Sequence, residues 1–235
     1  MGSVICISGI DTDIGKTVAT GLMAKALLLR GYSVITQKVA QTGCTGISED
    51  IQEHRKLMGV ELLSEDQDGL TCPYVFSKAC SPHLAAELEQ TQIDPKKITL
   101  ATQTLAERYD YVLLEGAGGF MVPLTRDITF LDYIQERGYP LILVSSPRLG
   151  SINHTLSALE LAKNRGIEIK GIVYNCYDSC DKTICADSRK VFVSFLQKYG
   201  FPTVVVDMTC AANHLQTDIN FDCLQLFETK GGAAR

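Results

Sequence analysis

Residues 9–17, with the sequence GIDTDIGKT, decide the fold of this chain. They follow a short apolar run, residues 4–8, and lead into a segment of helical periodicity, residues 18–30. A strand, a glycine-bounded loop ending in Gly-Lys-Thr and a helix, in that order, form the context of a phosphate-binding loop. Backbone N–H groups at the start of such a helix point at phosphate oxygens, and the helix dipole favours negative charge there.

Three residues of this loop have distinct expected roles. Gly15 lets the backbone approach the phosphates, Lys16 supplies a charge for the β- and γ-phosphates, and the Thr17 hydroxyl can bind Mg²⁺. Five residues separate the two glycines, whereas the common pattern has four. The alternative is a tight strand-to-helix turn with an exposed lysine, and the flanking segments favour the phosphate loop.

Composition predicts one soluble α/β domain spanning residues 1–235. The 235 residues are 46% hydrophobic and 21% charged, which is enough for a single sizeable core. The net charge is -5 and no basic stripe occurs, so we expect small-molecule partners and no nucleic acid. No apolar run is long enough to span a bilayer and no signal peptide is evident, so we expect no membrane contact and a cytoplasmic location.

Apolar runs and helical periodicity alternate along the chain. This alternation predicts a single-domain P-loop fold with a mostly parallel sheet and helices on both faces. Strands are expected at residues 4–8, 33–39, 111–115, 140–145, 169–174 and 203–206, with a further possible strand at 71–76. Helices are expected at residues 17–30, 50–58, 84–90, 94–109, 150–165, 187–199 and 221–228.

Charged side chains follow two of the expected strands. Lys38 ends the second strand and Glu115 ends the strand that precedes the glycines at 116, 118 and 119. Because ligands of open α/β sheets bind beyond the carboxyl ends of the strands, both side chains are expected near the phosphate loop. At this position Glu115 is expected to contact a metal ion. For Lys38, spacing alone does not decide between a residue near the ligand and a solvated lysine at the end of a strand. Asp50 begins the expected helix 50–58. Its spacing favours a carboxylate that interacts with the dipole at the N-terminus of this helix over a metal ligand.

Together these segments resemble the dethiobiotin synthetase family, over about residues 3–176 and in the same order. The spacing of five residues between the two glycines of the phosphate loop is a feature of that family. The segments that carry the resemblance are GxDTxxGKT at 9–17, Lys38 with Thr42-Gly43, Asp50, Ser81-Pro82-His83, EGAGG at 115–119 and LGSINH at 149–154. The chain departs from the family at Val39, at Cys176 and in residues 205–209, where the family customarily has a proline, an aspartate and a proline-bearing stretch.

The resemblance implies an ATP- and Mg²⁺-dependent ligase of biotin biosynthesis. An amine of 7,8-diaminopelargonate takes up CO₂ as a carbamate, ATP phosphorylates the carbamate, and the second amine closes the ring of dethiobiotin. A carbamate and a triphosphate repel each other, so the reaction needs concentrated positive charge. Lys16 and Lys38 would supply that charge as the catalytic residues.

The resemblance also implies binding roles for further residues. Mg²⁺ would be held by Thr17, Asp50 and Glu115, all hard oxygen ligands. Asn175 ends a strand, and its amide can pair with the base of the nucleotide. The remaining ATP contacts would be Asp13, Ile14, Gly15, Lys16, Thr17, Val18, Glu115 and Gly118. The substrate contacts would be Thr12, Lys38, Thr42, Ser81, Pro82, Gly150, Ser151, Ile152 and Asn153.

Family members act as homodimers, so the active site is expected to be shared. The segment 150–153 of one chain would bind the substrate carboxylate at the site of the other through the N–H groups of a helix N-terminus. An ordinary helix cap is the alternative for this segment, and both roles are compatible.

A P-loop ATPase switch of the partitioning type is the main competing hypothesis. Such proteins carry an extra lysine five positions before the loop lysine, and that position is Asp11 here. An amidotransferase-type synthetase would need a glutaminase domain, for which this chain is too short. An interaction module without turnover would leave Lys38, Asp50 and Glu115 without a role.

Overall fold

The computed structural model describes residues 1–177, 181–210 and 221–227, and it is built around one six-stranded sheet. The strand order is β2-β5-β1-β6-β7-β8, and every neighbouring pair is parallel. The strands of this sheet are β1 (Ser3–Gly9), β2 (Val34–Lys38), β5 (Tyr111–Gly119), β6 (Leu141–Ser145), β7 (Ile169–Tyr177) and β8 (Val205–Cys210). The predicted P-loop α/β fold is confirmed.

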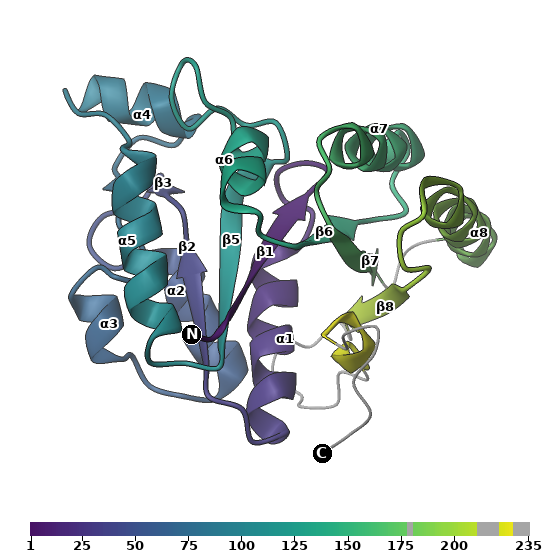
Figure 1. Ribbon diagram of the computed structural model, residues 1–235, viewed down its shortest axis with the longest axis horizontal. Helices are drawn as coiled ribbons and strands as arrows, with labels where there is room; N and C mark the ends of the chain where they lie inside the picture. Colours follow the sequence, from purple (N-terminus) through teal and green to yellow (C-terminus); the bar gives the residue numbers. More distant parts are fainter. Residues whose placement is uncertain (178–180, 211–220, 228–235) are drawn as a thin grey trace.

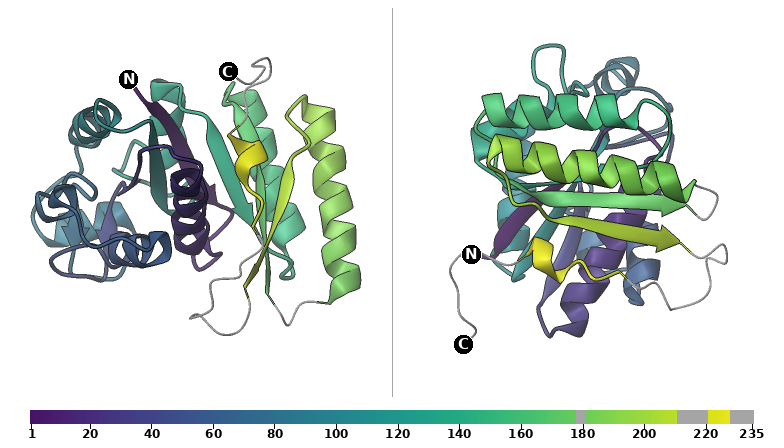
Figure 2. Two further views of the ribbon diagram at one scale, coloured as in Figure 1. Left: turned by 90° about the horizontal axis from the view of Figure 1, so that it is seen from below. Right: turned by 90° about the vertical axis from the view of Figure 1, so that its right-hand side faces the viewer.

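Helices cover both faces of the sheet. Figure 2 shows α7 and α8 side by side on one face of the strands and α1 on the opposite face. The helices are α1 (Lys16–Leu29), α2 (Glu49–Met58), α3 (Ser64–Gln67), α4 (Pro82–Leu88), α5 (Pro95–Ala106), α6 (Phe130–Arg137), α7 (Ser151–Asn164), α8 (Lys182–Tyr199) and the 3₁₀ helix η1 (Leu224–Leu226). Their arrangement along the sheet can be followed in Figure 1.

The two faces explain why the strands are continuously apolar. Side chains of a strand alternate between faces, so a strand covered on both sides is hydrophobic at every position. In β1, Cys6 packs into a core cluster with Phe130 and Phe192, whereas Ile5 and Ile7 pack on the other face with residues of α1. The sheet is therefore a rigid, fully buried support for whatever projects from its end.

The phosphate-loop segment lies where the strand order changes direction. From β1 the chain runs through α1 to β2 on one side of the sheet, whereas β6, β7 and β8 build outward on the other side. The loop that follows β1 thus opens into the crevice between the two halves, which is where open α/β sheets bind their ligands.

Several predicted elements have different bounds in the structure. Pro73 has no N–H donor, and only Val75–Phe76 of the possible strand at 71–76 forms β4, which pairs with β3 (Gln41–Thr42). The strand expected at 111–115 continues through the following glycines, so that β5 ends at Gly119. Helix α6 was not predicted, although Thr129 and Asp132 form a capping box at its start.

The C-terminal third differs most from the prediction. The last strand begins later and runs further than the expected 203–206, because residues 205–210 stay paired with β7 where no proline interrupts the ladder. Helix α8 begins five residues before the expected start at 187, with the Asp181 side chain as its N-cap. The expected helix at 221–228 is the short η1, and residue 228 lies outside the described residues.

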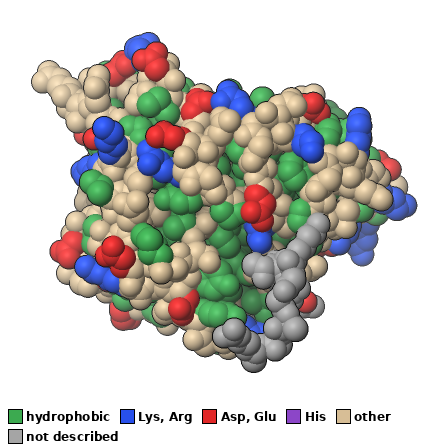
Figure 3. All heavy atoms as spheres, viewed as in Figure 1, with side chains coloured by type: hydrophobic (Ala, Val, Ile, Leu, Met, Phe, Trp, Pro, Cys, Tyr) green, Lys and Arg blue, Asp and Glu red, His purple; other side chains and the backbone are tan. Residues whose placement is uncertain are grey.

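The surface carries charges of both signs. Lys and Arg side chains lie interspersed with Asp and Glu on the face shown in Figure 3. None of the helices in the described segments combines the length and the hydropathy that crossing a bilayer requires.

A buried ion pair joins α2 to α3 beneath this surface. The Arg55 guanidinium donates from Nε and Nη2 to the two carboxylate oxygens of Asp66, at 2.9 and 2.8 Å. Both side chains are at most 2% exposed. On the surface, Arg126 binds Glu87 with the same two-point geometry, at 2.7 Å for each contact.

These two pairs allow a matched test of how much burial matters. We expect Asp66→Asn to lower the free energy of unfolding by about 3–5 kcal/mol, because it leaves the Arg55 charge buried without its partner. Glu87→Gln removes the same charge from an exposed pair and should leave the urea midpoint unchanged within error. Equal midpoints for both variants and the wild type would contradict the importance of the buried pair.

Candidate active site

A cavity of about 740 Å³ opens at the carboxyl ends of the central strands. The phosphate loop forms one wall, the ends of β2 and β5 form the floor, and the start of α2 lies opposite the loop. The cavity lining includes Lys16, Lys38, Asp50 and Glu115, so charged side chains from four separate segments meet there.

The phosphate loop has the backbone shape that its sequence requires. Gly15 is the N-cap of α1 with φ of 95°, a left-handed conformation that favours glycine. A Cβ atom at this position would lie 2.3 Å from the Asn175 amide nitrogen, so Gly15 is also required by close packing. That amide donates to the Ile14 carbonyl at 3.0 Å and ties the loop to β7.

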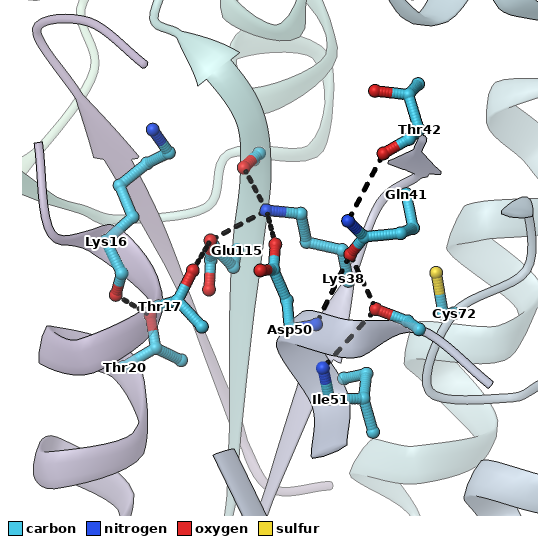
Figure 4. A network of polar contacts seen from close by, with 12 residues as sticks. Lys16, Thr17, Thr20, Lys38, Gln41, Thr42, Asp50, Ile51, Cys72 and Glu115 are labelled. Atoms are coloured by element: carbon cyan, nitrogen blue, oxygen red, sulfur yellow. Dashed lines mark hydrogen bonds and ion pairs between the residues drawn. The ribbon is translucent and has the colours of Figure 1, made fainter. Parts of the chain in front are cut away.

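Lys38 is the centre of the polar network shown in Figure 4. The parallel register places Lys38 of β2 beside Glu115 of β5. Its Nζ contacts Asp50 Oδ2 at 2.6 Å and Glu115 Oε1 at 2.7 Å, and it donates to the Gly116 carbonyl at 3.1 Å. Lys38 is therefore a buried, paired residue rather than a solvated strand-end lysine.

Charge pairing sets the ionisation of this network. Burial disfavours the ionised form of Glu115, but the charge of Lys38 and a hydrogen bond from His54 outweigh it and hold the pKa of Glu115 well below its usual range. Burial likewise disfavours the Lys38 ammonium, but the Glu115 and Asp50 carboxylates outweigh it and raise the pKa of Lys38. Both groups therefore carry their full charge at neutral pH.

Lys16 has the opposite environment. Burial and the nearby positive charge of Lys38 lower the pKa of Lys16 to about 8, although Glu115 and Asp50 act in the other direction. Lys16 is 5% exposed, and its Nζ donates to the Asp11 carbonyl at 2.9 Å. Among the described residues, no ion pair to a carboxylate is found for the Lys16 ammonium.

Asp50 reaches the site from the first turn of α2. Ser48 caps this helix, since its hydroxyl accepts from the Ile51 N–H at 3.3 Å. Gln41 supports the same turn, because its Oε1 accepts from the Ser48 hydroxyl at 2.7 Å and from the Asp50 N–H at 3.4 Å. Gln41 lines the cavity and was not predicted; its polar side chain three residues after Lys38 was the available signal.

His54 is a second residue that the sequence analysis missed. It is completely buried, and its Nε2 lies 2.8 Å from Glu115 Oε2. Asp50 and His54 are four residues apart on α2 and so lie on one face of the helix. That spacing could have placed both beside the expected carboxylate.

The structure brings most of the predicted site residues together. Those that line the cavity are Thr12, Asp13, Ile14, Gly15, Lys16, Thr17, Val18, Lys38, Thr42, Asp50, Glu115, Gly118 and Asn175. The cavity is also lined by Ala40, Gln41, Ala79, Ala117 and Met208, which were not predicted. Met208 belongs to β8.

Six predicted substrate contacts lie outside the lining of this cavity. Ser81 and Pro82 begin α4, two and three residues after the lining residue Ala79. The other four, Gly150, Ser151, Ile152 and Asn153, form the start of α7, where Ser151 is buried and Ile152 and Asn153 are exposed.

The chain is similar to a known family of proteins. A family model described as an AAA domain matches residues 3–215. The chain is 55% identical over 200 residues to the ATP-dependent dethiobiotin synthetase BioD of Chlorobaculum tepidum, a match that covers 85% of this chain and 84% of that protein. It is 59% identical over 181 residues to the enzyme named BioD 2 of Haemophilus influenzae, covering 77% of this chain and 95% of that one. The chain belongs to the dethiobiotin synthetase family.

Solved structures relate the family to a broader fold. The chain superposes on a ParA family ATPase from Chlorobium tepidum TLS with a TM-score of 0.52 at 17% identity, covering 90% of this chain and 86% of that chain. A ParA bound to nonspecific DNA, pNOB8 ParA, gives the same TM-score at 14% identity, covering 84% of this chain and 76% of that chain. At these identities the likeness concerns the fold alone. The competing hypothesis of a partitioning ATPase is therefore supported only by a shared fold.

The low pKa of Lys16 gives a testable pH dependence for nucleotide binding in this family member. Near pH 8 about half of the Lys16 side chains are neutral in the ligand-free protein, and triphosphate binding favours the ammonium form. We therefore expect proton uptake when ATP binds near pH 8 and a weaker apparent affinity as the pH rises further. Calorimetric titrations with a metal chelator, in buffers of different ionisation enthalpy, measure the uptake directly.

Lys16→Arg is the matched control for this experiment. An arginine stays protonated throughout this range, so the variant should bind ATP without that uptake. Proton release, or equal uptake by the variant and the wild type, would contradict the assignment to Lys16.

Proposed function

We propose that this chain is an ATP-dependent dethiobiotin synthetase that closes the ring of dethiobiotin from 7,8-diaminopelargonate and CO₂ in biotin biosynthesis. Its membership of the dethiobiotin synthetase family supports the reaction. The observation that carries the chemistry is the presence of Lys16 and Lys38 in one cavity, Lys16 from the start of α1 and Lys38 from the end of β2. The reaction must join two anions, and two buried ammonium groups provide the charge for that task.

The proposed reaction has three steps. An amine of the substrate attacks CO₂, forms a C–N bond and releases a proton, giving a carbamate. A carbamate oxygen then attacks the γ-phosphorus of ATP, and ADP leaves, so that a carbamic–phosphoric anhydride forms. The second amine attacks the carbonyl carbon, expels phosphate, loses a proton and closes the ring.

Lys38 and Lys16 have different tasks in this proposal. Lys16 holds the β- and γ-phosphates, as its place at the start of α1 supports. Lys38 lies between the two halves of the cavity and bridges the carbamate and the γ-phosphate. Thr12 and Thr42, which line the cavity, would hydrogen-bond the carbamate or the nitrogens of the substrate. Ser81 and Pro82, which follow the lining residue Ala79, would contact the substrate outside the cavity lining.

The remaining phosphate-loop residues and β7 bind the nucleotide in this proposal. The backbone of Asp13, Ile14, Gly15, Thr17 and Val18 would surround the phosphates, with Glu115 and Gly118 of β5 beside the loop. Asn175 has one amide hydrogen committed to Ile14, whereas its Oδ1 is buried without a hydrogen-bond partner among the described residues. That oxygen can accept from the amino group of adenine.

The donor set of the cavity fits Mg²⁺. Thr17, Asp50 and Glu115 offer a hydroxyl and two carboxylates, and the Lys38 ammonium already holds the two carboxylates together as a cation would. No group of three or more His, Cys, Asp or Glu within the described segments is arranged to hold a metal ion, and in this proposal the phosphates of ATP would supply the further oxygen ligands. When bound, Mg²⁺ would neutralise charge on the transferred phosphate.

A homodimer with a shared active site completes the proposal. The start of α7 exposes Ile152 and Asn153, outside the cavity of its own chain. Its N–H groups would bind the substrate carboxylate in the partner's site. We place the enzyme in the cytoplasm, where ATP is supplied; recovery in a membrane fraction after cell lysis would contradict this.

The direct test of the function is an assay with diaminopelargonate, bicarbonate, ATP and Mg²⁺ that follows dethiobiotin and phosphate together. Both products should appear in equal amounts and only when all components are present, and a chelator of Mg²⁺ should stop both. Phosphate release without dethiobiotin would instead favour the ATPase-switch alternative.

The role of Lys38 predicts a particular kinetic signature. Lys38→Gln should lower kcat by about a hundredfold or more and weaken ATP binding far less, because the charge that Lys38 meets develops during phosphoryl transfer. Steady-state kinetics and equilibrium ATP binding on the same preparation separate the two effects. A variant that loses only ATP affinity would show that Lys38 is a ground-state binder.

A shared site predicts complementation between two inactive variants. Lys16→Ala inactivates the phosphate loop, and Asn153→Trp obstructs the start of α7. A mixed dimer would combine one intact loop with the intact α7 of the other chain, so mixing should restore one working site per mixed dimer. Mixed dimers that form, as shown by mass spectrometry, yet remain inactive would contradict the shared site.

A further inference from the structure

A hydrogen-bonded chain of buried side chains leads from the second layer of the protein to Glu115. It begins at the Arg55–Asp66 ion pair, where Arg55 Nη1 also donates to the Thr36 hydroxyl at 2.8 Å. The Thr36 hydroxyl lies 3.0 Å from His54 Nδ1, and His54 Nε2 lies 2.8 Å from Glu115 Oε2. Thr36, His54 and Glu115 are all completely buried.

The donors and acceptors fix the direction of this chain. Arginine can only donate, so the Thr36 oxygen accepts from Arg55 and its own hydrogen remains for His54 Nδ1. The carboxylate can only accept, so the hydrogen of the imidazole lies on Nε2 and points at Glu115. With either role of Nδ1 toward Thr36, the donation from Nε2 to Glu115 is kept, and the two contacts together hold the orientation of the His54 ring.

The two oxygens of Glu115 consequently have different tasks. Oε2 is occupied by His54, whereas Oε1 faces Lys38 at 2.7 Å and the Thr17 hydroxyl at 3.2 Å. A carboxylate with one oxygen anchored cannot rotate about its terminal bond without breaking a buried hydrogen bond. The oxygen that faces the phosphates is thereby held in place.

We propose that His54 is a positioning residue that anchors Glu115, so that one defined carboxylate oxygen is presented to Lys38 and to the metal–nucleotide complex. This inference rests on the proposed function of the same site. Partners that orient a ligating carboxylate in this way typically change metal affinity or activity by 10–100-fold when they are removed.

Two conservative variants separate this role from simple packing. In His54→Gln, the side-chain amide nitrogen reaches the place of Nε2 and can still donate to Glu115. In His54→Asn, the amide ends at the place of Nδ1 and can bind Thr36 but not Glu115. The two changes have similar polarity, so they differ mainly in whether the anchor is kept.

The experiment measures binding of a non-hydrolysable ATP analogue to both variants by calorimetry, with chelator and across a Mg²⁺ titration, together with kcat and thermal unfolding. We expect His54→Asn to need about 10–100-fold more Mg²⁺ for half-maximal nucleotide binding and to lose a similar factor in kcat, with unchanged metal-free binding. His54→Gln should keep both the Mg²⁺ dependence of nucleotide binding and kcat close to the wild-type values.

Two results would overturn the proposal. One is a His54→Asn protein with the Mg²⁺ dependence of the wild type. The other is an equal loss in both variants that follows a drop in thermal stability, since this indicates packing alone. A wild-type protein that makes no dethiobiotin would instead refute the proposed function, and the Mg²⁺ dependence of nucleotide binding would still decide the role of His54.

Discussion

The structure of this site depends on one buried negative charge, the carboxylate of Glu115 at the carboxyl end of a central strand. An ionised carboxylate in a protein interior is costly unless it is paired and hydrogen-bonded. Here β2 provides Lys38, α2 provides His54 and α1 provides Thr17, so three elements are fixed relative to β5 by a shared acceptor. Folding therefore assembles the site, because the charge that stabilises this arrangement of elements is also the charge to which the proposed function assigns the metal contact.

The same constraint creates the asymmetry between the two lysines. The two carboxylates near Lys38 stabilise its charge, whereas burial and the charge of Lys38 disfavour the ammonium form of Lys16. In the proposed reaction, Lys16 meets a phosphate without giving up a carboxylate contact, whereas Lys38 would have to change its contacts with Asp50 and Glu115 to bind an anion. An ordered arrival of the two anions is consistent with this difference, and it requires only side-chain movement within the cavity.

Much of the fold and part of the site could be predicted from sequence because they depend on local patterns. The glycine-bounded loop, the apolar strands and the strand-end positions of Lys38 and Glu115 follow from spacing that each segment carries by itself. His54 was missed because its role arises from a contact with Glu115, which is far away in the chain. Gln41 was missed because its role depends on how the turn at Ser48 folds back onto it. The bounds of β8 were wrong for a similar reason, since pairing with β7 decides where that strand ends.

The phosphate loop is attached to the sheet at both flanks. The Ile10 N–H donates to the Val144 carbonyl of β6 at 3.1 Å, and the Ile14 carbonyl accepts from Asn175 of β7 at 3.0 Å. The conformational entropy of the loop is consequently lost when the chain folds and not when a ligand arrives. A small anion that contacts only this loop therefore does not have to order the loop when it binds. The same holds for a fragment of the nucleotide that carries only the phosphates.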